Sequence, residues 1–101
     1  METSIFCFCT DLADEGVETV LDNVAERGGL GGITVAAAYH DGRDVFPHNP
    51  RHAVRFLEEG AVFFPPDEVA RSRLRPPVSR AAEALPAAVA AARDRGLTAR
   101  A

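Results

Sequence analysis

A dense group of polar side chains follows the apolar run Gly32–Tyr39. His40, Arg43, Asp44 and His48 come within nine residues of its end. Imidazole, carboxylate and guanidinium groups are the side chains that hold polar ligands such as sugars. These residue types at this spacing therefore predict a binding site more clearly than they predict a reaction.

The elements that must position this group are two predicted parallel strands. Ser4–Thr10 and Ile33–Tyr39 are short runs that are apolar on both faces, which is typical of strands in a helix-covered parallel sheet. Between them, the i, i+3, i+4 and i+7 spacing of Val17, Val20, Leu21 and Val24 predicts an amphipathic helix that follows a polar loop and ends at Gly28-Gly29. The sequence predicts a βαβ unit.

Because parallel strands place their carboxyl ends at one edge, residues after both strands are expected to converge. Tyr39 or Phe46 would add an aromatic platform for a sugar ring. In the alternative interpretation, Arg43 and Asp44 pair with each other or cap the loop, while the histidines fill turns. The predicted substrate-binding residues are Asp11, Tyr39, His40, Arg43, Asp44 and His48.

A metal site is a competing interpretation, because His40, Asp44, His48 and His52 are all ligand types. Their spacing of four would align them on a helix, but glycine and proline within the segment argue against one, so we expect no metal. The glycine run 28–32 follows a helix and precedes a strand, the reverse of a phosphate-binding loop. We also expect no cofactor.

Beyond Pro50, two short β-prone runs flank a turn at Glu58-Glu59-Gly60. Ala53–Leu57 and Ala61–Pro65 are predicted to pair as a hairpin inserted after the second strand. One helical turn is expected over Asp67–Arg71, and residues 75–77 are expected to be an extended connector. The acidic pair in the turn is interpreted as solvated charge.

The C-terminal part predicts a helix over Arg80–Arg95, capped by Ser79, stopped by Gly96 and kinked or split at Pro86. Leu97 would then begin a third parallel strand. A sheet that stops there leaves apolar surface of the first strand uncovered. We therefore expect residues 1–101 to be a single, incomplete α/β domain.

Composition excludes some functions. A net charge of −4 gives no electrostatic reason to bind nucleic acid or an anionic membrane, and the apolar runs are shorter than a bilayer span. A soluble, cytoplasmic protein is expected. Cys7 and Cys9 would lie on one face of the first strand, too far apart for an easy disulfide, and are interpreted as buried free thiols.

The segment Leu21–Pro50 resembles the N-terminal part of bacterial, mostly actinobacterial, (β/α)8-barrel proteins similar to glycoside hydrolases. Its most specific part is Tyr-His-Asp-Gly-Arg-Asp with the following Pro-His-Asn-Pro, and the likeness spans roughly Phe6–Phe64. The resemblance implies that the βαβ unit, hairpin insertion and further helix form the first third of a TIM barrel. It also implies a carbohydrate or related polar ligand. The catalytic acids of such barrels follow strands four and seven, beyond this chain.

Two hypotheses from different classes follow. In the first, the chain is the N-terminal segment of a glycoside-hydrolase-like barrel that contributes carbohydrate-binding residues and is inactive alone. In the second, it is a small α/β interaction module. That module would self-associate or bind a protein partner through its hairpin and its uncovered sheet edge.

Overall fold

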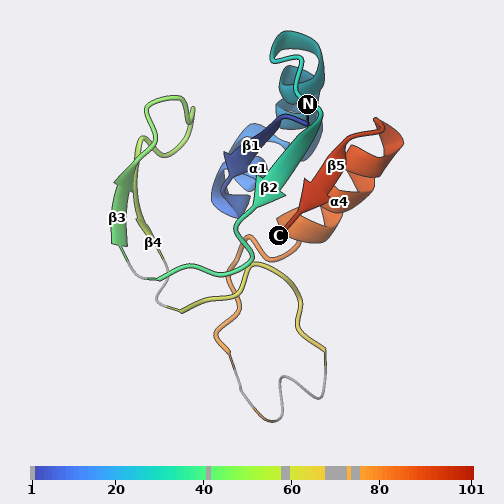
Figure 1. Cartoon of the computed structure of the whole chain (residues 1–101). Coiled ribbons are helices and arrows are strands. Elements are labelled where there is room, and N and C mark those ends of the chain that lie inside the picture. The colour runs from blue at the N-terminus through green and yellow to red at the C-terminus, as the bar shows by residue number, and fades with distance from the viewer. Residues whose placement is uncertain (1, 41, 58–59, 68–72, 74–75) are drawn as a thin grey trace.

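The computed structural model describes residues 2–40, 42–57, 60–67, 73 and 76–101. It is a mixed α/β fold with a three-stranded parallel sheet and a separate two-stranded antiparallel ribbon (Figure 1). The elements follow the chain in this order: β1 (Ser4–Cys7), α1 (Cys9–Glu15), α2 (Val17–Asp22), the π-helical η1 (Asn23–Arg27), β2 (Gly32–Val35), β3 (Gly42–Val45), β4 (Val54–Leu57), α4 (Ala84–Asp94) and β5 (Thr98–Arg100).

The parallel sheet has the order β1-β2-β5, with β2 in the centre. Ile5 pairs with Ile33, and Ile33 pairs with Ala99, both in parallel register. The expected βαβ unit and the third parallel strand after Leu97 are confirmed. The carboxyl ends of β1 and β2 therefore lie at the same edge, as the converging site requires.

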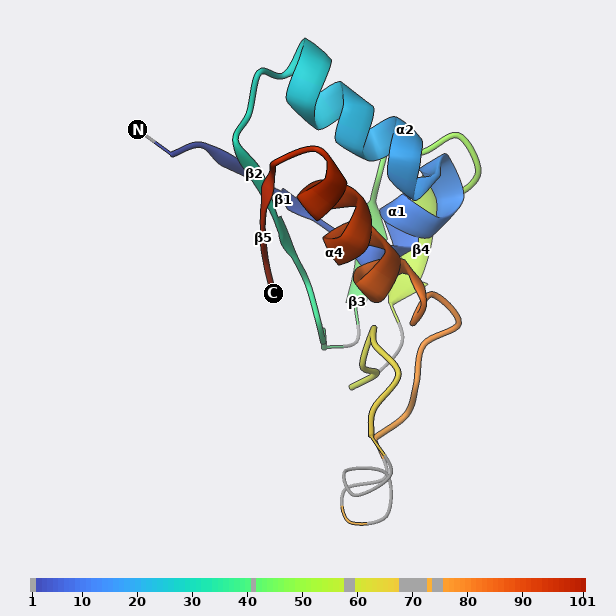
Figure 2. The same cartoon turned by 90° about the vertical axis from the view of Figure 1, so that its right-hand side faces the viewer.

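The helices α1, α2 and α4 all cover one face of this sheet (Figure 2). The core between the two layers includes Leu12, Leu21, Ile33, Val35 and Ala88, each at most 1% exposed. Alanines along the inner side of α4 leave little bulk between this helix and the sheet. The opposite face of the sheet carries no helix among the described residues.

The first strand ends earlier than predicted. The expected strand Ser4–Thr10 stops at Cys7, and Cys9–Glu15 is a helix where a polar loop was expected. Phe8 turns the chain, and its carbonyl oxygen accepts from the Leu12 amide at 3.1 Å. Cys9 consequently lies in a helix rather than on the strand face that Cys7 occupies. Both cysteines are free thiols, with Cys9 buried and Cys7 partly buried.

The predicted helix over Val17–Val24 is present in two parts, α2 and η1. At its end the Gly28 amide donates to Asn23 O at 2.8 Å, and Gly29 adopts a φ of 60°. The Leu30 amide then donates to Val24 O at 3.0 Å. A left-handed residue followed by this bond is the usual glycine stop of a helix, so the predicted end is confirmed.

The predicted hairpin partner was wrong. β4 pairs in antiparallel register with β3, from Gly42↔Leu57 to Val45↔Val54, and not with the run that follows it. The segment Gly42–Val45, for which the sequence argued against a helix, forms β3. Val62, from the expected second strand, instead bridges Ala38 and Val78. A loop over residues 46–53 joins the two strands of the actual ribbon.

The C-terminal helix is shorter than predicted, and Pro86 does not break it. Residues 80–83 form turns, and α4 begins at Ala84, which puts Pro86 in its first turn. Amides of the first turn have no acceptor within the helix, so proline costs nothing there. Ser79 caps the preceding turn, where its Oγ accepts from the Ala81 amide at 3.1 Å.

Some predictions fall outside the described residues. These are the Glu58-Glu59 turn, Arg75 of the predicted connector, and all of the expected helical turn Asp67–Arg71 except Asp67. Within the described part of the chain, no helix combines the length and the apolar character that crossing a bilayer requires.

Candidate functional site

Beside the carboxyl end of β1, Asp11 of α1 pairs with His48 of the loop that joins β3 to β4. Asp11 lies in the first turn of α1 and is 8% exposed, whereas the His48 side chain is 56% exposed. Asp11 Oδ2 lies 3.0 Å from His48 Nε2. Because a carboxylate oxygen can only accept, Nε2 carries the hydrogen in this pair. In the neutral ring, Nδ1 is then the atom that can accept a hydrogen bond from a ligand.

An aromatic cluster lies at the same edge. Phe8 makes edge-to-face contacts with Tyr39 at 5.1 Å and with Phe46 at 5.4 Å between ring centroids. Tyr39 in turn stacks on His40 at 4.3 Å, and Phe46 contacts the ring of His48 at 6.1 Å. Tyr39 and His40 keep exposed surface, so their stacked rings can receive a ligand. Phe46 is 5% exposed and cannot be the platform that the sequence offered as an alternative.

Asn49 joins the loop over residues 46–53 to helix α1. It is 6% exposed, and its Nδ2 donates to Asp11 Oδ1 at 2.7 Å and to Asp14 Oδ2 at 3.0 Å. Its Oδ1 accepts from the amides of Arg51 and His52, both at 2.9 Å. All the hydrogen-bonding atoms of this side chain are used, so Asn49 fixes the position of the neighbouring His48.

Asp14 is a second anchor on α1. Its Oδ2 accepts from His52 Nδ1 at 2.9 Å and also contacts Arg55 Nη2. Burial raises the pKa of Asp14, but the hydrogen bonds from His52, Asn49 and Arg55, together with the charge of Arg55, outweigh it. The net pKa lies below the ordinary value, so Asp14 is ionised at neutral pH.

Sequence reasoning assigned no role at this site to Asn49, Asp14 or Arg55. The available signal was Asn49 directly before Pro50, because asparagine in such a turn accepts from amides two and three residues later. The contacts to Asp11 and Asp14 span 38 and 35 residues of sequence and had no local signature.

Two of the predicted site residues lie on strand β3 of the ribbon, whereas His48 lies in the loop that joins the two ribbon strands. Arg43 is opposite Phe56 and Asp44 is opposite Arg55 in the β3–β4 register. Residues directly opposite share a face, so Arg43 lies on the outer face with the exposed Val45, Val54 and Phe56. The structure therefore brings Asp11 and His48 together and links Tyr39 and His40 to them through the rings of Phe8 and Phe46, whereas Arg43 and Asp44 lie on β3 of the ribbon.

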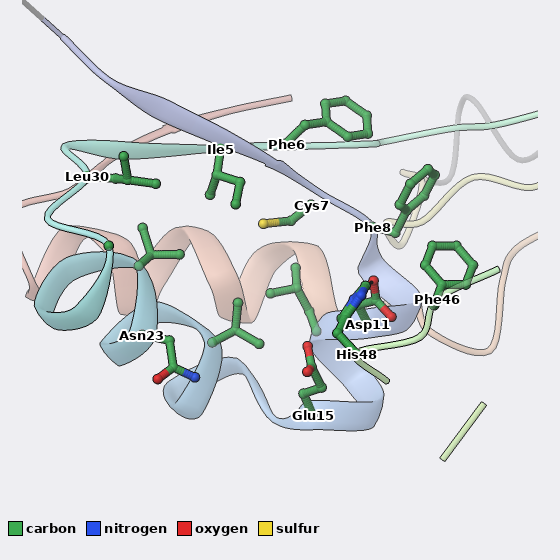
Figure 3. A pocket seen from close by; sticks show the side chains of 14 residues that line it. Ile5, Phe6, Cys7, Phe8, Asp11, Glu15, Asn23, Leu30, Phe46 and His48 are labelled. Carbon is green, nitrogen blue, oxygen red and sulfur yellow. Dashed lines mark hydrogen bonds and ion pairs between the residues drawn. The ribbon is translucent and has the colours of Figure 1, made fainter. Parts of the chain in front are cut away.

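An apolar groove of about 440 Å³ extends from this edge along β1 (Figure 3). Ile5, Cys7 and Leu30 line it along its length, and Asp11 and His48 lie at one end beside Phe46 and Phe8. Burial, and then the charges of Asp11 and Glu15, raise the pKa of the Cys7 thiol to about 11. Burial and the proximity of Cys7 raise that of Cys9 to about 11 as well. Neither thiol is an activated nucleophile.

The four residues of the alternative metal interpretation lie at different places. His48 contacts Asp11, His52 contacts Asp14, and His40 stacks on Tyr39. Asp44 lies on β3, opposite Arg55. Residues 2–40, 42–57, 60–67, 73 and 76–101 contain no group of three or more histidine, cysteine or acidic side chains suited to hold a metal ion.

Comparison with protein-family models, with curated proteins and with solved structures finds no match to this chain.

Proposed function

We propose that this chain is the N-terminal segment of a glycoside-hydrolase-like (β/α) barrel and that it binds carbohydrate at the carboxyl ends of β1 and β2. One observation carries the proposal. A buried carboxylate, Asp11, holds a half-exposed imidazole, His48, at one end of a row of aromatic contacts that runs through Phe46 and Phe8 to the stacked Tyr39 and His40. In this proposal the segment alone has no hydrolase activity, because the catalytic acids belong to later strands.

The chemistry of the four residues suits a sugar. Hydroxyl groups of a sugar both donate and accept, so they can bond to the free nitrogen of His48 and to the exposed atoms of Tyr39 and His40. The C–H face of a pyranose ring is apolar and packs on flat aromatic surface. A site that offers both kinds of contact fits a carbohydrate better than a purely apolar or a purely ionic ligand.

The order of the elements supports the barrel part of the proposal. The strands follow one another in the sheet in chain order, β1-β2-β5, and the connecting helices lie on the same face (Figure 2). Doubly wound sheets instead reverse their strand order and carry helices on both faces. The 43% exposure of Ile5 and the 56% exposure of Phe6 also fit a strand that further chain would cover.

Ligand-detected NMR with gluco-, manno-, galacto- and xylo-oligosaccharides tests the binding. We expect at least one sugar to bind the native chain and both Asp11→Asn and His48→Gln to weaken it about tenfold or more, as expected for a lost charge-assisted contact. Glu26→Gln, which removes an exposed carboxylate on η1, is the matched control and should bind normally. Equal binding by Asp11→Asn and the control would contradict the proposal.

The ribbon favours a second candidate function, association with a second copy or another protein. Val45, Val54 and Phe56 are 68%, 52% and 76% exposed and share its outer face. Contiguous exposed apolar side chains on a strand pair are typical of an interaction surface.

Sedimentation velocity of the native chain and of Phe56→Ser distinguishes this candidate from the first. Self-association through the ribbon predicts a concentration-dependent dimer that Phe56→Ser abolishes. A monomer at all concentrations, or a dimer that survives the substitution, would argue against self-association through this face. Neither outcome depends on whether sugar binds at the sheet edge.

A further inference from the structure

A second cavity, separate from the groove along β1, lies where three segments of the chain meet. Its volume is about 490 Å³, and α1, the segment leading into β4 and the turn after Ser79 form its walls. We call it the arginine cavity, after three of the residues that line it, Arg51, Arg55 and Arg80. None of the three is among the predicted site residues.

The charge of this cavity is opposite to that of the whole chain. The three guanidinium groups face one carboxylate, Asp14, which leaves an excess of two positive charges when His52 is neutral. Arg55 pairs with Asp14, whereas Arg51 and Arg80 form no ion pair with any described residue. The chain as a whole has a net charge of −4. A local positive excess in an acidic protein concentrates anions at that place.

The walls also contain hydrogen-bond donors without acceptors. Thr10 is 7% exposed, and its Oγ1 has no partner in the described structure. Arg55 Nε is buried and equally without a partner. Ser79 is 5% exposed, and its Oγ accepts from the Ala81 amide, so its hydroxyl hydrogen is left to donate. Buried donors without acceptors cost free energy, and functional sites are one place where proteins keep them.

We propose that the arginine cavity binds a tetrahedral oxyanion, the phosphate group of a small phosphorylated ligand or free phosphate. A phosphate monoester carries close to two negative charges at pH 7, which matches the two guanidinium groups that lack an ion pair. Its oxygens are acceptors only, which suits a site whose unused groups are arginine N–H and hydroxyl donors. Planar guanidinium groups are the preferred side chains for such an anion. This inference is independent of the carbohydrate proposal.

Titration of ¹⁵N-labelled protein with inorganic phosphate at constant ionic strength tests the site. We expect saturable shifts of the amides of Thr10, His52 and Ala81. Arg51→Gln and Arg80→Gln should each weaken the affinity about tenfold or more. Both residues are exposed, so the variants should fold, and an unchanged circular dichroism spectrum checks this. Arg27→Gln, an exposed arginine on η1 outside the cavity, is the matched control and should bind phosphate like the native chain.

Titrations with other anions distinguish free phosphate from a phosphate ester as the ligand. Sulfate should bind comparably, acetate much more weakly, and a sugar phosphate more tightly than free phosphate if the natural ligand is an ester. The proposal is overturned if acetate shifts the same amides equally well. It is also overturned if the shifts do not saturate, as expected for a general salt effect, or if Arg27→Gln loses as much affinity as Arg80→Gln.

Discussion

At the scale of single residues, Asn49 connects the parts of the candidate site. One amide side chain donates to two carboxylates of α1 and accepts from two amides of its own loop. It is buried, as is its bond to Asp11, so water could not easily replace that bond. The position of His48 over Asp11 depends on this residue as much as on the strands.

Replacement of Asn49 by alanine should therefore destabilise the fold by about 2–4 kcal/mol, because the buried Asp11 carboxylate, the partly buried Asp14 carboxylate and two loop amides would lose a shared partner. Urea unfolding at pH 7 measures this. Asn23→Ala is the matched control, since Asn23 is exposed and makes one long bond of 3.4 Å to Arg27. A change within about 0.5 kcal/mol is expected for it. Equal effects of the two substitutions would show that the Asn49 contacts add nothing to stability.

The lowered pKa of Asp14 predicts a pH dependence. A carboxyl group with a folded-state pKa below its ordinary value of 3.8 stabilises the fold above that value, and the contribution is lost as the pH falls through the folded pKa. Asp14→Asn should be less stable than the native chain by about 1–2 kcal/mol at pH 7. The difference should shrink steadily below pH 4. Thermal unfolding across this range measures it, and a difference independent of pH would contradict the assignment.

At the scale of elements, the sequence predicted strands and helices where apolar periodicity was strong. The two parallel strands, the helix ending at Gly28-Gly29 and the third strand after Leu97 are present. The strand end at Thr10 was wrong because Phe8-Cys9-Thr10 continues an apolar, β-prone pattern although the chain already turns into α1. The predicted hairpin partner of β4 was wrong because its true partner, β3, pairs with it through exposed residues such as Val45 and Val54. Exposed pairs leave no burial pattern in the sequence.

The close approach of β2 and β5 depends on Gly32. A Cβ atom added there would lie 2.6 Å from Thr98 O, whereas one added at Gly31 would meet its nearest neighbour, Thr3 O, at 3.5 Å. Gly32→Ala should therefore cost about 1–3 kcal/mol and should speed hydrogen exchange of the Thr98 amide, which donates to Gly31 O at 2.9 Å. Gly31→Ala should leave both nearly unchanged. If the two variants behaved alike, the tight β2–β5 approach would be incorrect.

At the scale of the whole molecule, all described helices adjoin one face of a short sheet, and the groove along β1 stays open. Expectation and structure agree on the adjacency of the first two strands, because burial on both faces leaves a strong sequence signal. They differ on the site. Asp11 and His48 converge as expected. Arg43 and Asp44 do not, because they lie in strand β3, which forms within the segment that follows Tyr39. Contacts between residues distant in sequence, such as that of Asn49 with Asp14, could not be predicted from the sequence because only the folded chain brings these residues together.

The most direct test of the central claim is a backbone amide shift map of ¹⁵N-labelled protein titrated with the oligosaccharide that binds best. A site at the carboxyl ends of β1 and β2 predicts saturable shifts that gather at Phe8, Asp11, Tyr39, His40 and His48, with Val54 and Phe56 on the ribbon unaffected. Shifts confined to the ribbon, or no saturable shift with any sugar in the series, would contradict the claim that these two strand ends form a carbohydrate site.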